Sequence, residues 1–396
     1  MTRFPDGGSS LYQAKRPLMQ PVIVVLIAAS ILLAACGATV ANQNWPSLAK
    51  QDDRVYVAYG PSVAAVDVAE RSVLWTYPEE PSQTLLFYAR PSLSDGRIIL
   101  GDFGASGGLF SHQATVTVYA LSQPEGENSP PSLLWSRDDV ATDRIIAPAL
   151  QTDGQVFIGT ADNHLYALDA SNGDLQWEFE TGHSVWAQPV YSEGRVFVAS
   201  LDNSVYALDA QNGELLWQTT MDGAIASQPS LNEGLLYVPS FDRQVHALDV
   251  DTGDEIWTAD AENWVWASPL VQNGTVYYAD IDGNVYAVDA GTGQEQWTVT
   301  VQGAIQSAPL YDDGVLFLTA GEIEGEEEER QGQVLALDAA NGDELWQRET
   351  PAPVFSSPVI VNDSVVVVFQ DGDVSRLLVY EKDDGAQVWE FTLPNE

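Results

Sequence analysis

The sequence predicts an all-β fold, an eight-bladed β-propeller made of four-stranded antiparallel blades. Two observations carry this prediction: one motif recurs about every forty residues, and each repeat is strand-like throughout. Residues 166–177 read Tyr-Ala-Leu-Asp-Ala-Ser-Asn-Gly-Asp-Leu-Gln-Trp, and residues 206–217 read Tyr-Ala-Leu-Asp-Ala-Gln-Asn-Gly-Glu-Leu-Leu-Trp. The tryptophan that closes the motif recurs along the chain at Trp75, Trp135, Trp177, Trp217, Trp257, Trp297, Trp346 and Trp389.

Each repeat is expected to hold four short strands separated by turns. In the sixth repeat, apolar residues 276–279 and 285–288 flank the pair Asp282-Gly283. Such a pair favours a two-residue hairpin, because both central residues must tolerate positive φ. Aspartates that recur in register at this turn are expected to be scaffold rather than site; they are Asp162, Asp202, Asp242, Asp282 and Asp371.

A second turn follows in each repeat and is marked by an aspartate and, four residues later, a glycine. Asp289 and Gly293 are one example, in which glycine supplies a left-handed residue and the carboxylate accepts backbone N–H groups. A single four-stranded sheet buries too little surface to be stable, so the repeats must pack on one another. Radial packing gives a propeller, and one large indole per blade can pack into the neighbouring blade. Eight copies predict eight blades over residues 45–396.

The N-terminus is typical of an exported lipoprotein. Basic residues precede an apolar run, 22–35, that is shorter than the roughly 20 residues needed to span a bilayer. The run ends in Ala34-Ala35-Cys36, which resembles the bacterial lipobox, and Cys36 is the only cysteine. We therefore expect a signal peptide over 1–35, lipidation of Cys36, and a short tether over 36–44. An ordinary signal peptide with a chance cysteine, or an uncleaved anchor, are the alternatives.

The composition excludes several classes of function. Lys and Arg total 16 against 57 Asp and Glu, a formal charge of −41, which opposes binding to nucleic acid. A single cysteine excludes a disulfide framework and a multi-cysteine metal site, and there are only four histidines. The sequence contains no recognisable Ser-His-Asp order, phosphate loop or paired-carboxylate motif. Neither catalytic nor metal-binding residues are predicted.

The combination Ala-x-Asp-x-x-x-Gly-x-x-x-Trp resembles the PQQ-like, or tryptophan-docking, propeller repeat, and the resemblance covers nearly all of the chain after the tether. Members of this family are either quinoprotein dehydrogenases, which hold pyrroloquinoline quinone and Ca²⁺, or lipid-anchored scaffolds. A lipobox followed by one bare eight-bladed propeller is similar to the BamB family of outer-membrane assembly lipoproteins. The dehydrogenases carry long insertions around a cofactor pocket, and several stack the quinone on a disulfide of adjacent cysteines. A chain with one cysteine cannot form that disulfide.

The resemblance implies a non-catalytic scaffold for protein–protein interaction that needs neither quinone nor calcium. It would act as a monomer within a larger complex at the cell envelope, held by its lipid anchor. Gly37 follows the cysteine, so no acidic inner-membrane retention signal is present. In a host with two membranes we therefore expect the periplasmic face of the outer membrane, and otherwise the cell surface. A PQQ-dependent dehydrogenase and a glycan-binding surface module remain the alternative functions.

Residues that break the repeat are the candidates for a partner-binding rim. Two insertions, 103–115 and 321–333, and several aromatic residues on blade-to-blade connections are expected to share one face. The candidates are Tyr88, Trp186, Trp264, Trp266, Phe355, Glu326, Glu327 and Glu328. Exposed aromatic residues are frequent anchors in protein interfaces. The alternative is that the aromatic residues plug the central channel and the glutamates only solvate a loop.

Overall fold

The computed structural model describes residues 45–82, 85–94, 96–104, 116–124, 129–152, 154–321 and 331–394. The predicted signal peptide, Cys36, the tether, and the loop glutamates Glu326, Glu327 and Glu328 lie outside the described residues. In the described part of the chain, no helix is long and apolar enough to cross a membrane.

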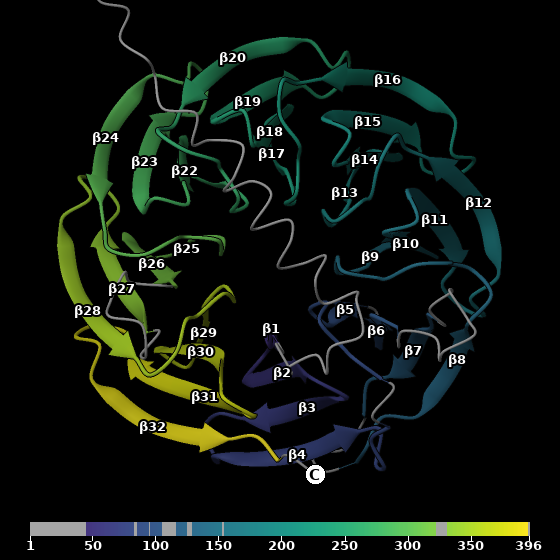
Figure 1. The fold of residues 1–396 in the computed structure, drawn as a ribbon, viewed down its shortest axis with the longest axis horizontal. Helices are drawn as coiled ribbons and strands as arrows, with labels where there is room; N and C mark the ends of the chain where they lie inside the picture. The colour runs from purple at the N-terminus through teal and green to yellow at the C-terminus, as the bar shows by residue number, and fades with distance from the viewer. Residues whose placement is uncertain are drawn as a thin grey trace, which may run out of the picture. The chain divides into compact units, whose positions relative to one another are not determined.

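The described strands form eight four-stranded antiparallel sheets arranged in a ring, as Figure 1 shows, so the predicted fold is confirmed. Blade 1 contains β1 (Ser47–Gln51), β2 (Arg54–Tyr59), β3 (Ser62–Asp67) and β4 (Ser72–Tyr77). Blade 2 contains β5 (Ser92–Ser94), β6 (Arg97–Gly101), β7 (Val118–Ser122) and β8 (Leu133–Arg137). Blade 3 contains β9 (Leu150–Thr152), β10 (Gln155–Gly159), β11 (His164–Asp169) and β12 (Leu175–Glu180). Blade 4 contains β13 (Val190–Ser192), β14 (Arg195–Ala199), β15 (Ser204–Asp209) and β16 (Leu215–Thr220).

The remaining blades repeat the same order. Blade 5 contains β17 (Ser230–Asn232), β18 (Leu235–Ser240), β19 (Gln244–Asp249) and β20 (Glu255–Asp260). Blade 6 contains β21 (Leu270–Gln272), β22 (Thr275–Ala279), β23 (Asn284–Asp289) and β24 (Glu295–Thr300). Blade 7 contains β25 (Leu310–Asp312), β26 (Val315–Ala320), β27 (Gly332–Asp338) and β28 (Glu344–Thr350). Blade 8 contains β29 (Val359–Val361), β30 (Ser364–Asp371), β31 (Val374–Glu381) and β32 (Gln387–Thr392).

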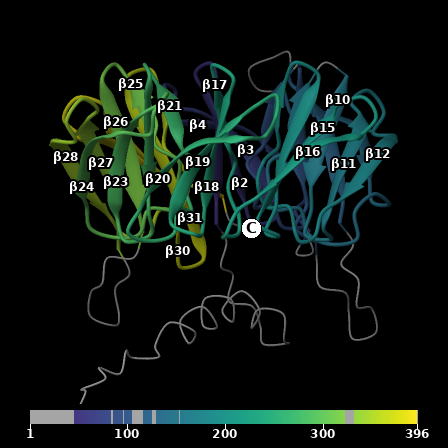
Figure 2. The ribbon, with the colours of Figure 1, turned by 90° about the horizontal axis from the view of Figure 1, so that it is seen from above.

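Each blade is a simple meander, so its connections fall on two opposite faces (Figure 2). Turns between the first and second strands, and between the third and fourth, share what we call the turn face. Turns between the second and third strands share the other face with the connections from one blade to the next, and we call it the crossing face. The two insertions predicted from the sequence belong to second-to-third connections, those between β6 and β7 and between β26 and β27. The described ends of both connections therefore lie on the crossing face.

The tryptophans of the repeat lie between blades. Six of them donate an indole hydrogen bond of 2.9–3.2 Å to a backbone carbonyl in the third-to-fourth turn of the following blade. These six are Trp135, Trp177, Trp217, Trp257, Trp297 and Trp346. Trp75 is buried in the apolar core shared by blades 1 and 2. Trp389 is half-buried against the core shared by blades 8 and 1.

The ring closes by side-chain packing between its first and last blades. Leu48 and Val57 of blade 1 share one apolar core with Val368 and Val379 of blade 8. Every sheet consists of four consecutive strands, so within the described residues no sheet combines strands from both ends of the chain. In Figure 1 the yellow blade 8 lies directly beside the purple blade 1.

Candidate partner-binding face

Four of the predicted rim residues occupy one equivalent position in their blades. Tyr88, Trp186, Trp266 and Phe355 each lie four residues before the first residue of an inner strand, namely β5, β13, β21 and β29. All four are half-buried on the crossing face. Three other blades carry smaller or polar residues at this position, Ile146, Ala226 and Gln306. An aromatic residue at this position is therefore present in some blades and absent from others.

One group of aromatic rings is centred on Phe241, in the turn between β18 and β19. The ring of Phe241 stacks on Trp264 with centroids 5.2 Å apart and planes 17° from parallel. It also contacts Trp266, with centroids 5.1 Å apart. All three side chains are half-buried, so each presents part of its ring to solvent. We call Phe241, Trp264 and Trp266 the aromatic platform.

Two further ring contacts lie on the same face. Tyr88 meets Phe103 edge-on at 4.5 Å, and the guanidinium of Arg144 lies 5.0 Å from the Phe103 ring. Burial raises the pKa of the Tyr88 hydroxyl, and the nearby Arg144 partly opposes that rise. Phe355 contacts Trp45, whose side chain is 50% exposed, at 5.9 Å. The structure thus brings the candidates together in separate groups.

Trp186 differs from the other candidates. Its indole nitrogen is buried and has no hydrogen-bond partner within the described part of the chain. A buried N–H without an acceptor costs free energy, in contrast to the paired indoles of the docking tryptophans.

Phe241, Phe103 and Trp45 were missing from the sequence-based candidates. Phe241 occupies a turn position that holds Ala161, Leu201 and Ile281 in other blades, so an aromatic departure from an apolar repeat was the available signal. Trp45 occupies in blade 1 the position that Trp186 occupies in blade 4. Ala49 pairs with Tyr56 as Val190 pairs with Phe197, and each tryptophan lies four residues before the first residue of its pair.

Aspartates at the second-to-third turns fix the connections that carry these aromatic residues. In four blades the carboxylate accepts a backbone N–H from the preceding connection, at 2.6–3.1 Å. The pairs are Asp102 with Leu86, Asp162 with Thr142, Asp202 with Gly182, and Asp280 with Asn263. Asp102 is nearly fully buried, and burial raises the pKa of its carboxyl despite the two backbone N–H groups bound to it.

Blade 6 uses its turn aspartates differently from the other blades. Asp282 occupies the predicted hairpin turn but is exposed. The fully buried Asp280, two residues earlier, accepts the N–H of Asn263 and the hydroxyl of Tyr286. Asp282 therefore aligns with the turn aspartates of the other blades but does not make their hydrogen bonds. In blade 6 the carboxylate that makes them belongs to Asp280, two residues earlier.

His246, on β19, replaces a tyrosine that several other blades carry at this position. In blades 3 and 4 the equivalent residues, Tyr166 and Tyr206, donate their hydroxyls to the turn aspartates Asp162 and Asp202. The imidazole of His246 is instead held between Asp242, at 3.0 Å, and Glu255, at 2.8 Å. Burial lowers the pKa of His246, but the hydrogen bonds and charges of both carboxylates outweigh it and raise the pKa above its usual value.

Comparison with known proteins now places the chain. The family model described as outer membrane protein assembly factor BamB matches residues 114–227, 202–306 and 281–396. These overlapping matches cover most of the chain. The chain belongs to the BamB family. Among curated protein sequences, none matches the chain.

Solved structures agree with the BamB-like propeller fold at low sequence identity. The crystal structure of BamB from Moraxella catarrhalis is 17% identical with a TM-score of 0.63, over 87% of this chain and 95% of that one. The computationally designed protein Ika8 is 18% identical with a TM-score of 0.67, over 86% and 98%. Quinohemoprotein alcohol dehydrogenase from Comamonas testosteroni is 15% identical with a TM-score of 0.61, over 78% and 67%. At these identities the likeness shows the fold alone.

Proposed function

We propose that this BamB-family propeller is a non-catalytic scaffold of the cell envelope that binds a protein partner through its crossing face. The observation that carries the proposal is the aromatic platform. Phe241 stacks on Trp264 and contacts Trp266, and all three side chains are half-buried. Phe241 and Trp264 depart from the residues that other blades carry at their positions. Clustered aromatic rings with a preformed geometry are the usual anchors of protein interfaces.

Family membership supports the same function. The related protein from Moraxella catarrhalis is BamB, and the matching family model is described as an outer membrane assembly factor. By analogy, the partner here would belong to the machinery that assembles outer-membrane proteins, and the propeller would act as one subunit of that complex.

The dehydrogenase alternative fits the residues poorly. Bound to this fold, pyrroloquinoline quinone with Ca²⁺ would supply the oxidising chemistry. A calcium-bound quinone needs several carboxylate or carbonyl oxygens at one point. The described residues bring together no group of three or more His, Cys, Asp or Glu side chains that could hold a metal ion. The single cysteine of the chain also prevents a disulfide of adjacent cysteines.

The membrane anchor is part of the proposal. Lipidation of Cys36 would tether the propeller to a membrane surface, and acyl chains contribute about 0.8 kcal/mol per buried CH₂ group. A Cys36→Ser variant should move from the membrane fraction to the soluble fraction on cell fractionation. Retention at the wild-type level would contradict the anchor but leave the propeller's partner binding open to separate measurement.

The partner-binding test is cross-linking and affinity capture of the detergent-extracted full chain, followed by mass spectrometry. A Trp264→Ala/Trp266→Ala variant should lose at least tenfold of its captured partner while keeping its thermal unfolding midpoint near wild type. Tyr191→Ala is the matched control, because Tyr191 is 42% exposed and lies on β13 away from the platform.

Three outcomes would contradict the proposal. Unfolding of the double variant would show that the platform plugs the channel instead. Capture of glycans on an array, lost in the same variant, would favour a glycan-binding module. Dye-linked alcohol or sugar oxidation after addition of quinone and Ca²⁺ would favour the dehydrogenase.

A further inference from the structure

Four Asn-Gly pairs lie in turns of the propeller, and all four asparagines are exposed. In such a pair the backbone nitrogen of glycine can attack the side-chain carbonyl carbon of asparagine, because glycine has no Cβ atom to hinder the approach. The reaction requires that this nitrogen is free and that the backbone around it can move. The pairs are Asn172-Gly173, Asn212-Gly213, Asn273-Gly274 and Asn341-Gly342.

Three of the pairs lie in third-to-fourth turns, where the reacting atoms are bound. The backbone N–H of each glycine donates to the carbonyl of the turn aspartate four residues earlier, at 2.8 Å. The side-chain Oδ1 of each asparagine accepts the backbone N–H of the residue two positions later, at 2.9 Å. The attacking nitrogen and the amide that it would attack are therefore held apart by separate hydrogen bonds.

Packing between blades also fixes these three turns. A Cβ atom added to Gly173 would come within 2.6 Å of the Trp135 ring, and one added to Gly342 within 2.8 Å of the Trp297 ring. Gly213 lies equally close to the indole of the preceding blade. The glycine backbone cannot approach the asparagine side chain unless this contact between blades opens.

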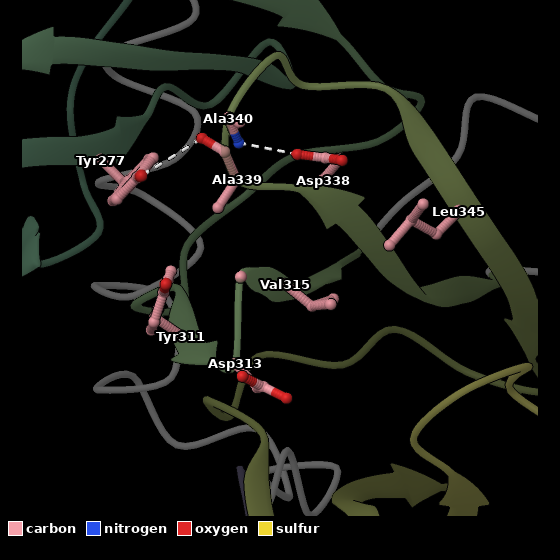
Figure 3. Close-up of a pocket in the computed structure, with 9 residues that line it drawn as sticks. Tyr277, Tyr311, Asp313, Val315, Asp338, Ala339, Ala340 and Leu345 are labelled. Carbon is pink, nitrogen blue, oxygen red and sulfur yellow. Dashed lines mark hydrogen bonds between the residues drawn. The ribbon is translucent and has the colours of Figure 1, made fainter. Parts of the chain in front are cut away.

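The turn that holds Asn341 shows how many bonds such an opening would break. Asp338 accepts the N–H of Ala340 at 2.8 Å, and the Tyr277 hydroxyl of the preceding blade donates to the Ala339 carbonyl at 3.2 Å (Figure 3). The indole of Trp297 donates to the same carbonyl at 3.1 Å. Both partners of Ala339 come from the neighbouring blade, so the turn is anchored from outside as well as from within.

The fourth pair, Asn273-Gly274, lies in the turn between β21 and β22 and lacks this protection. The N–H of Gly274 makes no hydrogen bond within the described residues, and a Cβ atom added there would meet nothing within 4 Å. The Asn273 side chain donates from Nδ2 to the Tyr311 hydroxyl at 3.2 Å, and its Oδ1 accepts from Gln272 Nε2 at 3.5 Å. Neither contact holds the glycine nitrogen.

We propose that Asn273 is a site of spontaneous covalent modification, at which the amide becomes an aspartyl or isoaspartyl carboxylate while the other three asparagines stay intact. The Gly274 nitrogen bonds to Cγ of Asn273, the Cγ–Nδ2 bond breaks, and the amide proton leaves with Nδ2 as ammonia. Water then opens the cyclic succinimide at either carbonyl. The net change is one water added and one ammonia lost, with no oxidant or reductant.

The modification would change the turn face and leave the crossing face as it is. A carboxylate replaces the amide that donates to the Tyr311 hydroxyl. Opening of the ring to isoaspartate also adds one carbon to the backbone of this turn. The inference is independent of the aromatic platform, because the turn between β21 and β22 lies on the opposite face.

The test is peptide mapping by mass spectrometry of the full chain, held folded at mildly alkaline pH, where the amide nitrogen loses its proton more readily. The peptide with Asn273 should gain the mass that marks exchange of NH₂ for OH at least about tenfold faster than the other three. Those three react only when their turns open locally. In concentrated urea all four sites should react at similar rates, which attributes the difference to the fold.

Two tryptophan variants serve as matched controls for each other. Trp135→Ala removes the indole against Gly173 and should speed modification of Asn172 severalfold without changing the rate at Asn341. Trp297→Ala, which uncovers Gly342, should do the reverse.

The proposal is overturned if the folded chain modifies all four asparagines at the same rate, or any of the other three before Asn273. It is also overturned if Asn273 stays intact in the folded chain while it reacts in urea. Equal acceleration of Asn172 and Asn341 in both tryptophan variants would contradict the local protection on which the proposal rests.

Discussion

The indole of Trp257 lies against the backbone of Gly293 in the next blade, so closely that a Cβ atom on Gly293 would come within 2.6 Å of the ring carbon Cε3. The same tryptophan donates a 3.0 Å hydrogen bond to the carbonyl of Ala290. Glycine at this turn therefore has two functions: it adopts a φ of 70° and it leaves room for the neighbouring indole. The glycine and tryptophan that recur in the sequence therefore form one contact between consecutive blades.

Gly293→Ala should be more destabilising than a glycine substitution that adds backbone strain alone. A left-handed alanine costs about 1–2 kcal/mol, and overpacking against the indole adds about 1–3 kcal/mol. Gly274→Ala is the control, because Gly274 has a similar φ of 77° and a Cβ atom added there would meet nothing within 4 Å. Urea unfolding should give a larger loss for Gly293→Ala; equal losses would show that the contact with Trp257 does not matter.

Asp280 is a buried hydrogen-bond acceptor, whereas Asp282 is an exposed residue of the repeated turn. Asp280→Ala leaves the N–H of Asn263 and the hydroxyl of Tyr286 without their acceptor, and should cost about 3 kcal/mol of unfolding free energy. Asp282→Ala, at an exposed site, should stay within about 0.5 kcal/mol of wild type. Thermal denaturation of the two variants checks this, and a larger effect at Asp282 would reverse the assignment.

The sequence predicted the number and kind of blades because the contacts between blades are repeated in it. Trp257, Asp289 and Gly293 recur in register in several blades, so their spacing indicates both the four-stranded repeat and its contact with the next blade. Closure of the ring was not predictable in this way. It depends on packing of residues such as Leu48 and Val368, which lie at opposite ends of the chain and follow no shared pattern.

The candidate sites were predictable only where a residue breaks the repeat. Trp264 and Trp266 stand out in the sequence, but their contact with Phe241 needs a turn and a connection that meet only in the folded blade.

His246 should make the stability of blade 5 depend on pH. Its pKa is raised in the folded protein, because the carboxylates of Asp242 and Glu255 outweigh the effect of burial. The resulting stabilisation is complete below the ordinary histidine pKa of about 6.5 and is lost as the pH rises through the higher folded value. Wild type should therefore lose stability as the pH rises above about 6.5 relative to His246→Tyr, whose hydroxyl can donate to Asp242 as Tyr206 does to Asp202.

Glu255→Gln is the partial control for this pH effect. It removes one of the two carboxylates that bind His246 and keeps Asp242, so the pH-dependent loss should shrink without disappearing. Thermal unfolding midpoints over the same pH range measure it. Parallel pH curves for wild type and His246→Tyr would mean that His246 does not control this dependence.

The boundary between blades 8 and 1 should be the weakest in the ring. Trp389 is half-buried and its indole makes no hydrogen bond within the described residues, whereas Trp257 is 9% exposed and its indole is bonded to Ala290. Trp257→Ala should cost about 3–5 kcal/mol, the usual range for truncating a buried tryptophan, and Trp389→Ala about half as much. Because blades 8 and 1 are not consecutive in the chain, unlike the blades at every other boundary, limited proteolysis of the Trp389→Ala variant should begin at β32 or β1. Cleavage that begins instead within blades 3 to 6, or equal losses of unfolding free energy, would show that the closing boundary is as strong as the others.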